Sequence, residues 1–159
     1  MKHTEIASEL FSKRYYCSQA VLAAFAEELG MTKEQALRVG ACFGGGMCKA
    51  EVCGACTGAL MALGLKYGMC EDGDLESKER ANSYAVRFLD EFAKQNGSYI
   101  CRELLDCDIS TDEGKAYARE KGAVCNGMSQ DDRECGAYRR KADKRIILPY
   151  EKYGFLSRK

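Results

Sequence analysis

Apolar residues recur in the first part of the chain at the three- and four-residue steps of an amphipathic helix. Between positions 17 and 29, the apolar side of such a helix would be formed by Cys17, Ala20, Val21, Ala24, Phe25 and Leu29. Gly30 follows where a helix commonly ends in a left-handed residue. The pattern therefore predicts a helix over about 17–29.

A capping signal predicts a second helix directly afterwards. Thr32 and Gln35 have the spacing of a capping box. The inner side of this helix would be formed by Leu37, Ala41 and Phe43. Three glycines at 44–46 then either end the helix and allow close chain approach, or offer backbone N–H groups to an anion or to sulfide or thiolate sulfurs.

The segment from Cys53 to Met69 is almost entirely apolar and rich in small residues. A helix without a polar face lies inside a bundle, where glycine and alanine let neighbouring backbones come close. We therefore expect this segment to be a buried central helix.

Three further helices are predicted in the second half of the chain. One has Tyr84, Phe88 and Phe92 on its apolar side and ends before Asn96-Gly97. A capping box formed by Ser110 and Glu113 precedes a short polar helix that reaches about Lys121. The last helix is expected over about 131–148, where Pro149 would stop it.

No segment alternates strictly enough between apolar and polar residues to require a strand. We therefore predict an all-α fold, a bundle of about five to seven helices. The chain has 159 residues, 46% of them hydrophobic and 30% charged, which is the size and composition of one folded domain over 1–159.

Charge and hydropathy exclude several function classes. The formal net charge is zero, so there is no general attraction to nucleic acid or to an anionic membrane. No segment approaches the roughly 20 apolar residues of a membrane-spanning helix, and the first residues do not form a secretory signal. We expect a cytoplasmic protein with no nucleic-acid partner and no membrane insertion.

In that compartment, a chain with ten cysteines is more often metal-binding or catalytic than cross-linked by disulfides. Cys53 and Cys56 form a CxxC pair at the start of a helix, where the helix dipole would stabilise a thiolate. Together with Cys48 they also have the C-x4-C-x2-C spacing of plant-type ferredoxins. Cys42 and Cys70 are expected to be buried, inert thiols.

The single histidine, His3, limits the remaining cofactors. No cysteine pair is followed by a histidine, which excludes covalent haem attachment, and a hydrolase with a histidine base is equally disfavoured. A structural zinc site would need four thiolates, yet the chain offers one CxxC knuckle rather than two.

The order of several motifs resembles the redox-active protein family named for its cysteine pattern, C_GCAxxG_C_C. The motifs span about 15–125 and are YYCSQAVLAAF around Cys17, FGGGM at 43–47, CGACTGALMALGL from Cys53, CRELL from Cys101, and Cys125. The resemblance implies a helical fold in which Cys17, Cys53, Cys101 and Cys125 are functional. The remaining six cysteines are extra to the pattern: Cys42, Cys48, Cys56, Cys70, Cys107 and Cys135.

The cysteine-bearing part of split-Soret cytochromes is similar, and there the cysteines are associated with an iron–sulfur centre beside haem. We therefore expect an iron–sulfur cluster bound by the four family cysteines and used for electron transfer or redox sensing with a partner protein. A thiol-disulfide oxidoreductase is the alternative, with Cys53 as reactive thiol and Cys56 or a family cysteine resolving it. A zinc-stabilised interaction module ranks third.

Overall fold

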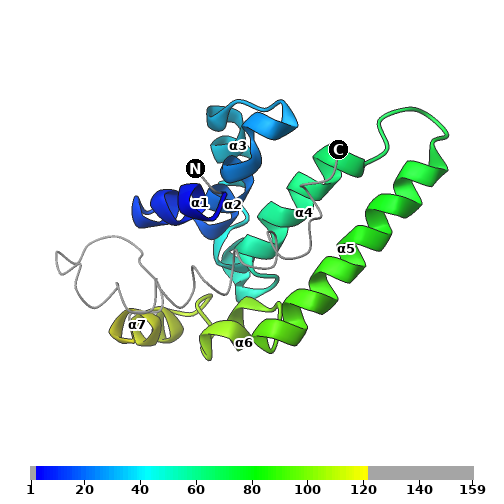
Figure 1. The fold of residues 1–159 in the computed structure, drawn as a ribbon. Helices are drawn as coiled ribbons and strands as arrows, with labels where there is room; N and C mark the ends of the chain where they lie inside the picture. The colour runs from blue at the N-terminus through cyan, green and yellow to red at the C-terminus, as the bar shows by residue number, and fades with distance from the viewer. Residues whose placement is uncertain (1–2, 122–159) are drawn as a thin grey trace.

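The computed structural model describes residues 3–121, and within this range it contains helices and a single isolated β-bridge but no strand. The predicted all-α fold is thus confirmed (Figure 1). The α-helices are α1 (His3–Ser12), α2 (Cys17–Phe25), α3 (Lys33–Gly40), α4 (Gly54–Tyr67), α5 (Leu75–Asn96), α6 (Cys101–Leu105) and α7 (Asp112–Glu120). A 3-10 turn, η1 (Glu27–Leu29), follows α2, and a π-helical turn, η2 (Gly46–Ala50), precedes α4.

The local signals at helix ends are confirmed. Gly30 and Gly97 both have left-handed backbones, with φ of 72° and 90°. Thr32 caps α3, because its hydroxyl accepts a hydrogen bond from the Gln35 N–H at 3.1 Å while the Gln35 side chain accepts one from the Thr32 N–H.

Three boundaries differ from the predicted ones. The predicted helix over 17–29 changes from α-helix to a 3-10 turn after Phe25. Helix α3 already ends at Gly40, before the glycine run. The N-cap of α7 is Thr111, whose hydroxyl accepts from the Gly114 N–H, because the Ser110 hydroxyl instead donates to Asp108. The helix predicted over 131–148 lies outside the described residues.

Helix α2 lies at the centre of the N-terminal part and packs against α1, α3 and α4. Its contact with α4 is close because Gly58 has no side chain: a Cβ there would lie 2.6 Å from the Ser18 carbonyl oxygen. The buried Ser18 hydroxyl donates to the Gly40 carbonyl at 2.7 Å, which joins α2 to the end of α3. This packing fixes the start of α2 against the first turns of α4.

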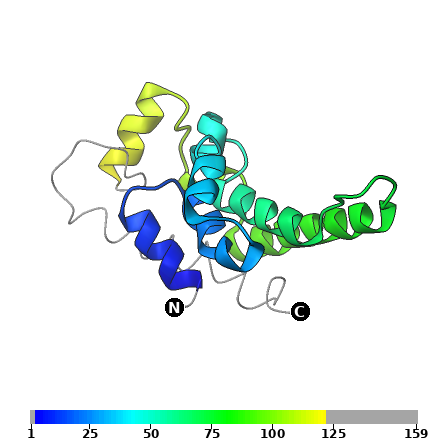
Figure 2. The same cartoon turned by 90° about the horizontal axis from the view of Figure 1, so that it is seen from above.

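Helix α4 fits the predicted central helix only over its first three turns. Those turns are buried between α2 and α5, where Phe88 and Phe92 of α5 are almost completely covered. The end of α4 and the start of α5 instead form a hairpin that extends away from α1 and α7 (Figure 2). Leu65 is 50% exposed and Leu75 61% exposed in this hairpin.

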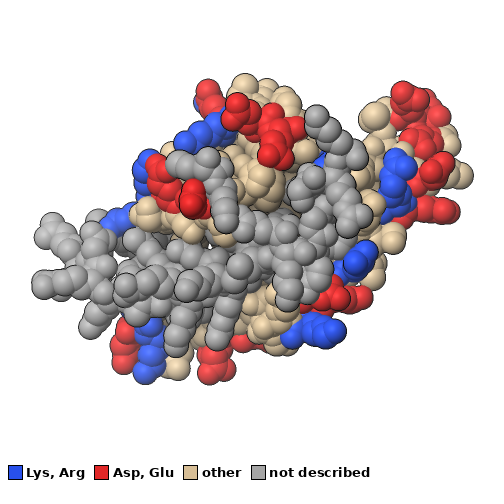
Figure 3. Space-filling view, in the orientation of Figure 1, with Lys and Arg blue, Asp and Glu red and all other residues tan. Residues whose placement is uncertain are grey.

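Charged residues decorate the outside of the helices on the face shown in Figure 3. Acidic side chains gather at the tip of the α4–α5 hairpin, where the sequence supplies Glu71, Asp72, Asp74, Glu76 and Glu79. Among residues 3–121, none of the helices combines the length and the apolar character that crossing a membrane requires.

Candidate redox site

Backbone pairing brings two distant cysteines to the same place. Val52 and Ile100 form an antiparallel β-bridge. On either side of it, the Cys53 N–H donates to the Tyr99 carbonyl at 2.8 Å and the Cys101 N–H donates to the Glu51 carbonyl at 2.6 Å. Cys53 is the N-cap of α4 and Cys101 is the first residue of α6. The bridge therefore sets the starts of these two helices side by side, with both cysteines buried.

The start of α2 adds a third cysteine. The Cys17 sulfur lies against the first turn of α4, where Gly54 makes room for it: a Cβ on Gly54 would lie 2.4 Å from this sulfur. The Cys17 thiol donates a hydrogen bond to the Cys53 sulfur, and the Cys53 thiol donates in turn to Cys56. Cys17, Cys53, Cys56 and Cys101 are called the thiol cluster below.

A left-handed turn forms one wall of the thiol cluster. Gly45, Gly46, Met47 and Cys48 have consecutive positive φ angles of 60°, 63°, 57° and 58°. Side chains adopt this conformation at a cost of about 1–2 kcal/mol per residue, so Met47 and Cys48 are held there by their surroundings. The turn presents the Gly45 N–H to the Cys17 sulfur as a hydrogen-bond donor. Of the two roles considered for the glycine run, donation to sulfur is therefore present.

Three thiols of this cluster, those of Cys17, Cys53 and Cys101, hold their protons tightly. Donation to Cys53 raises the pKa of Cys17 well above its usual range, and burial adds to the effect. The bond accepted from Cys17 lowers the pKa of Cys53, but its own bond to Cys56, burial and neighbouring thiols outweigh it and raise that pKa to about 12. Burial and the nearby Cys17 raise the pKa of Cys101 to about 12.

These surroundings do not favour the thiolate expected at Cys53 from its position at a helix start. The bond accepted from Cys17 lowers the pKa of this thiol, but its bond to Cys56, burial and the neighbouring thiols together raise that pKa to about 12. In the metal-free protein, the raised pKa values of Cys17, Cys53 and Cys101 keep these three thiols protonated at neutral pH.

The structure separates the other cysteines from this cluster. Cys48, of the ferredoxin-like spacing, is exposed and its thiol lies 3.9 Å from the Gly44 carbonyl oxygen. Within residues 3–121, no three or more His, Cys, Asp or Glu side chains are arranged to hold one metal ion, so that spacing does not form such a site. Cys42 and Cys70 are exposed, and the prediction that they are buried is wrong because they lie beyond the packed parts of α3 and α4.

Two further cysteines belong to the neighbourhood of the site without being in the family pattern. Cys56 is fully buried one turn into α4, and its link to Cys53 was visible in the sequence as the CxxC spacing. Cys107 is half-buried after the end of α6, and its charge interaction with Cys101 raises the pKa of Cys101 further. No sequence signal indicated Cys107. Cys125 and Cys135 lie outside the described residues.

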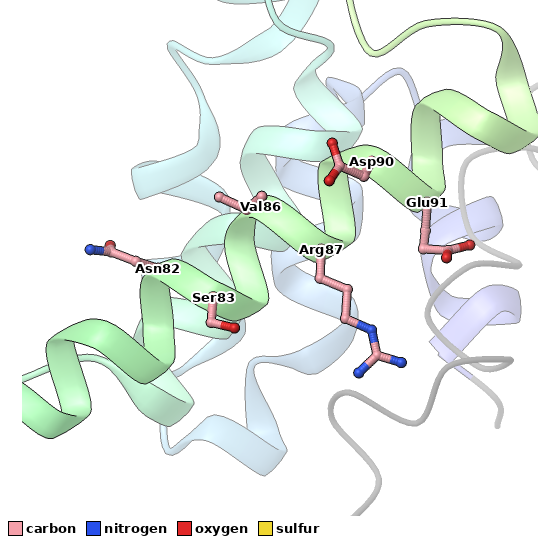
Figure 4. A pocket seen from close by; sticks show the side chains of 6 residues that line it. All are labelled: Asn82, Ser83, Val86, Arg87, Asp90 and Glu91. Carbon is pink, nitrogen blue, oxygen red and sulfur yellow. The ribbon is translucent and has the colours of Figure 1, made fainter.

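A surface hollow of about 500 Å³ lies elsewhere, along the outer side of α5. Its described lining residues, labelled in Figure 4, all come from this helix: Asn82, Ser83, Val86, Arg87, Asp90 and Glu91. The side chains point outward from a single helix face, which makes the hollow an open groove rather than an enclosed binding cavity. The thiol cluster is therefore the better candidate site.

Fold and site define an all-α protein with a largely buried cluster of thiols assembled from three separate segments. The family described as "Putative redox-active protein (C_GCAxxG_C_C)" matches residues 15–136, and the chain belongs to this family. The match covers all the helices from α2 to α7 and supports a redox role. No curated protein and no solved structure matches the chain.

Proposed function

We propose that this protein is a one-electron carrier or redox sensor that binds an iron–sulfur cluster through Cys17, Cys53, Cys101 and Cys125. The observation that carries the proposal is the convergence of Cys17, Cys53 and Cys101 from the starts of α2, α4 and α6. The similarity of this region to the cysteine-bearing part of split-Soret cytochromes points the same way. When bound, such a cluster supplies reversible one-electron chemistry.

The chemistry of the donors fits this group. Thiolates are the ligands of iron–sulfur clusters, and backbone N–H donors to sulfur tune their potentials. The thiol cluster offers the cysteine sulfurs, and the Gly45 N–H is a backbone donor to one of them. Among residues 3–121 no group of three or more such donors is arranged to hold one metal ion, so the fit rests on donor chemistry and on the approach of Cys17, Cys53 and Cys101 to one another.

The protein's own residues would prepare the site in three ways. Burial of Cys53 and Cys101 excludes water from two thiols, and their high pKa keeps them protonated and unreactive until a cation displaces the protons. The bridge between Val52 and Ile100 fixes the spacing of these two thiols. Gly54 leaves the space that the Cys17 sulfur occupies.

A thiol-disulfide oxidoreductase is the second candidate, and the contact between Cys17 and Cys53 favours it. Loss of two electrons and two protons to an acceptor disulfide would join these sulfurs, and the acceptor would become a dithiol. The high pKa of both thiols makes attack on that acceptor slow at neutral pH. The iron–sulfur proposal therefore has the stronger support. The zinc alternative ranks third, because a structural zinc ion would need four thiolates around one ion.

The test is analysis of the full chain purified without oxygen and reconstituted with ferrous iron and sulfide. The proposal expects a coloured protein with iron and acid-labile sulfide in equal amounts and a visible spectrum that bleaches on reduction with dithionite. Colourless, iron-free protein after this treatment would contradict it. A reversible disulfide that joins Cys17 to Cys53 in the same preparation, identified by mass spectrometry, would instead favour the second candidate.

A further inference from the structure

Arg102 makes a set of contacts that the proposed ligands alone do not explain. It follows Cys101 on α6, and its guanidinium donates to the Ala50 carbonyl at 3.1 Å and to the Lys49 carbonyl at 3.3 Å. The same guanidinium forms an ion pair with the Glu51 carboxylate. One side chain thus binds three consecutive residues of the segment before Cys53, about half the described chain away in sequence.

The segment that Arg102 binds has a backbone conformation that its own residues disfavour. Lys49 and Ala50 end the turn that begins with Gly45 and Gly46, and Ala50 itself has a positive φ of 55°. The Glu51 N–H closes the turn by donating to the Gly46 carbonyl at 3.1 Å. A conformation that its own residues disfavour persists only where neighbouring groups fix it. Among the described residues, Arg102 supplies the side-chain contacts to the end of this turn, at Lys49, Ala50 and Glu51.

The other end of the turn reaches the thiol cluster, where the Gly45 N–H donates to the Cys17 sulfur. Contacts therefore run from Arg102 through the end of the turn to Gly45 and on to Cys17. An N–H directed at a sulfur ligand stabilises the added negative charge of a reduced site and raises its reduction potential. A substitution at Arg102 would thus alter the hydrogen bonding of the Cys17 sulfur.

We infer that Arg102 is a positioning residue of the thiol cluster, which acts by holding the left-handed turn so that the Gly45 N–H stays directed at the Cys17 sulfur. The planar fork of arginine binds two carbonyls and a carboxylate together, and the single ammonium of lysine does not reproduce this geometry. The role of Arg102 in positioning the turn does not depend on a bound cluster. The effect on a reduction potential rests on the function proposed above.

The experiment compares wild type with Arg102→Gln, Arg102→Lys and the control Arg38→Gln, all as full chains. Arg38 is matched because it pairs with Glu34 on the exposed side of α3, at 2.8 Å, and no hydrogen bond or ion pair of the described residues joins its side chain to the turn. Two measurements use the metal-free, reduced protein: hydrogen exchange of the amides at 45–53, and the rate of Cys17 alkylation read by mass spectrometry. A third is the reduction potential of the reconstituted protein.

Both Arg102 variants are expected to speed amide exchange at 45–53 by about tenfold, since charge-assisted hydrogen bonds are lost. Both should slow alkylation of Cys17, because the Gly45 N–H that stabilises its thiolate is no longer directed at the sulfur. Both should also shift the potential to more negative values, a change that a role in stability alone would not produce. Arg38→Gln should match wild type in all three measurements. Unchanged exchange and alkylation in Arg102→Gln would overturn the inference, as would full rescue by Arg102→Lys. If wild type bound no cluster, the proposed function would fail, and the two metal-free measurements would still decide the role of Arg102.

Discussion

The cysteines of this chain fall into two regions with opposite surroundings. Cys53, Cys56 and Cys101 are buried at the starts of α4 and α6, whereas Cys42, Cys48 and Cys70 lie exposed in turns and beyond helix ends. The residue type is the same, but burial and sulfur neighbours raise the pKa values of Cys53 and Cys101, and both lie next to thiols from other segments. The number of cysteines therefore says little about the site, because the packed starts of α2, α4 and α6 decide which thiols lie together.

The largest expected difference between the two regions is in thiol reactivity. In metal-free, reduced protein at pH 8, Cys53 should react with iodoacetamide roughly a thousandfold more slowly than an ordinary thiol, because its pKa is about 12. Its rate should keep rising about tenfold per pH unit towards pH 12, since a raised pKa delays formation of the thiolate. Mass spectrometry of each labelled cysteine measures this, with Cys70 as the exposed reference. Equal rates at Cys53 and Cys70 would remove the distinction between the regions.

Two glycines of α4 allow the packing at the thiol cluster to be tested separately from helix propensity. Gly54→Ala should destabilise the protein by about 1–3 kcal/mol, because the new methyl group would lie 2.4 Å from the Cys17 sulfur and 3.0 Å from the Phe43 carbonyl oxygen. Gly64→Ala is the matched control, as nothing lies within 4 Å of its new methyl group, and it should stabilise the helix by up to about 1 kcal/mol. Urea unfolding measures both changes. Similar effects of the two substitutions would show that the start of α4 is not tightly packed.

The helix caps and the left-handed turn show which parts of the fold the sequence could predict and which it could not. Caps at Gly30, Thr32 and Gly97 were predictable because each depends on residues within a few positions of it. The turn at Met47 and Cys48 was not, since both residue types disfavour positive φ and only distant contacts hold them there. Local rules alone place these two residues in an ordinary helix or loop.

The same limit applies to the candidate site. Local spacing grouped Cys48, Cys53 and Cys56, yet the structure leaves Cys48 outside and brings in Cys17 and Cys101. The bridge between Val52 and Ile100 and the close approach at Gly54 create this arrangement, and both are long-range contacts without a sequence period. The family resemblance nominated Cys17 and Cys101 because the order of its motifs reflects the folded chain.

A smaller difference between the two regions is expected in the loss of stability when a cysteine is replaced by serine. Cys56→Ser should cost about 1–3 kcal/mol of unfolding free energy, because a hydroxyl would replace a fully buried thiol. Cys70→Ser should stay within about 0.5 kcal/mol of wild type, since Cys70 is exposed. Thermal unfolding of the metal-free proteins measures both. A Cys56→Ser protein as stable as wild type would mean that position 56 is less enclosed than the structure has it.

The central claim is that cysteines from three distant segments form one working site, and the most direct test is the iron and acid-labile sulfide content of single serine variants reconstituted side by side. Cys17→Ser, Cys53→Ser and Cys101→Ser should each lose most of the bound iron and sulfide together with the visible spectrum. Cys42→Ser and Cys70→Ser should retain the wild-type amounts, because these thiols are exposed and outside the cluster. Full iron and sulfide in the first three variants, or their loss in the last two, would contradict the claim.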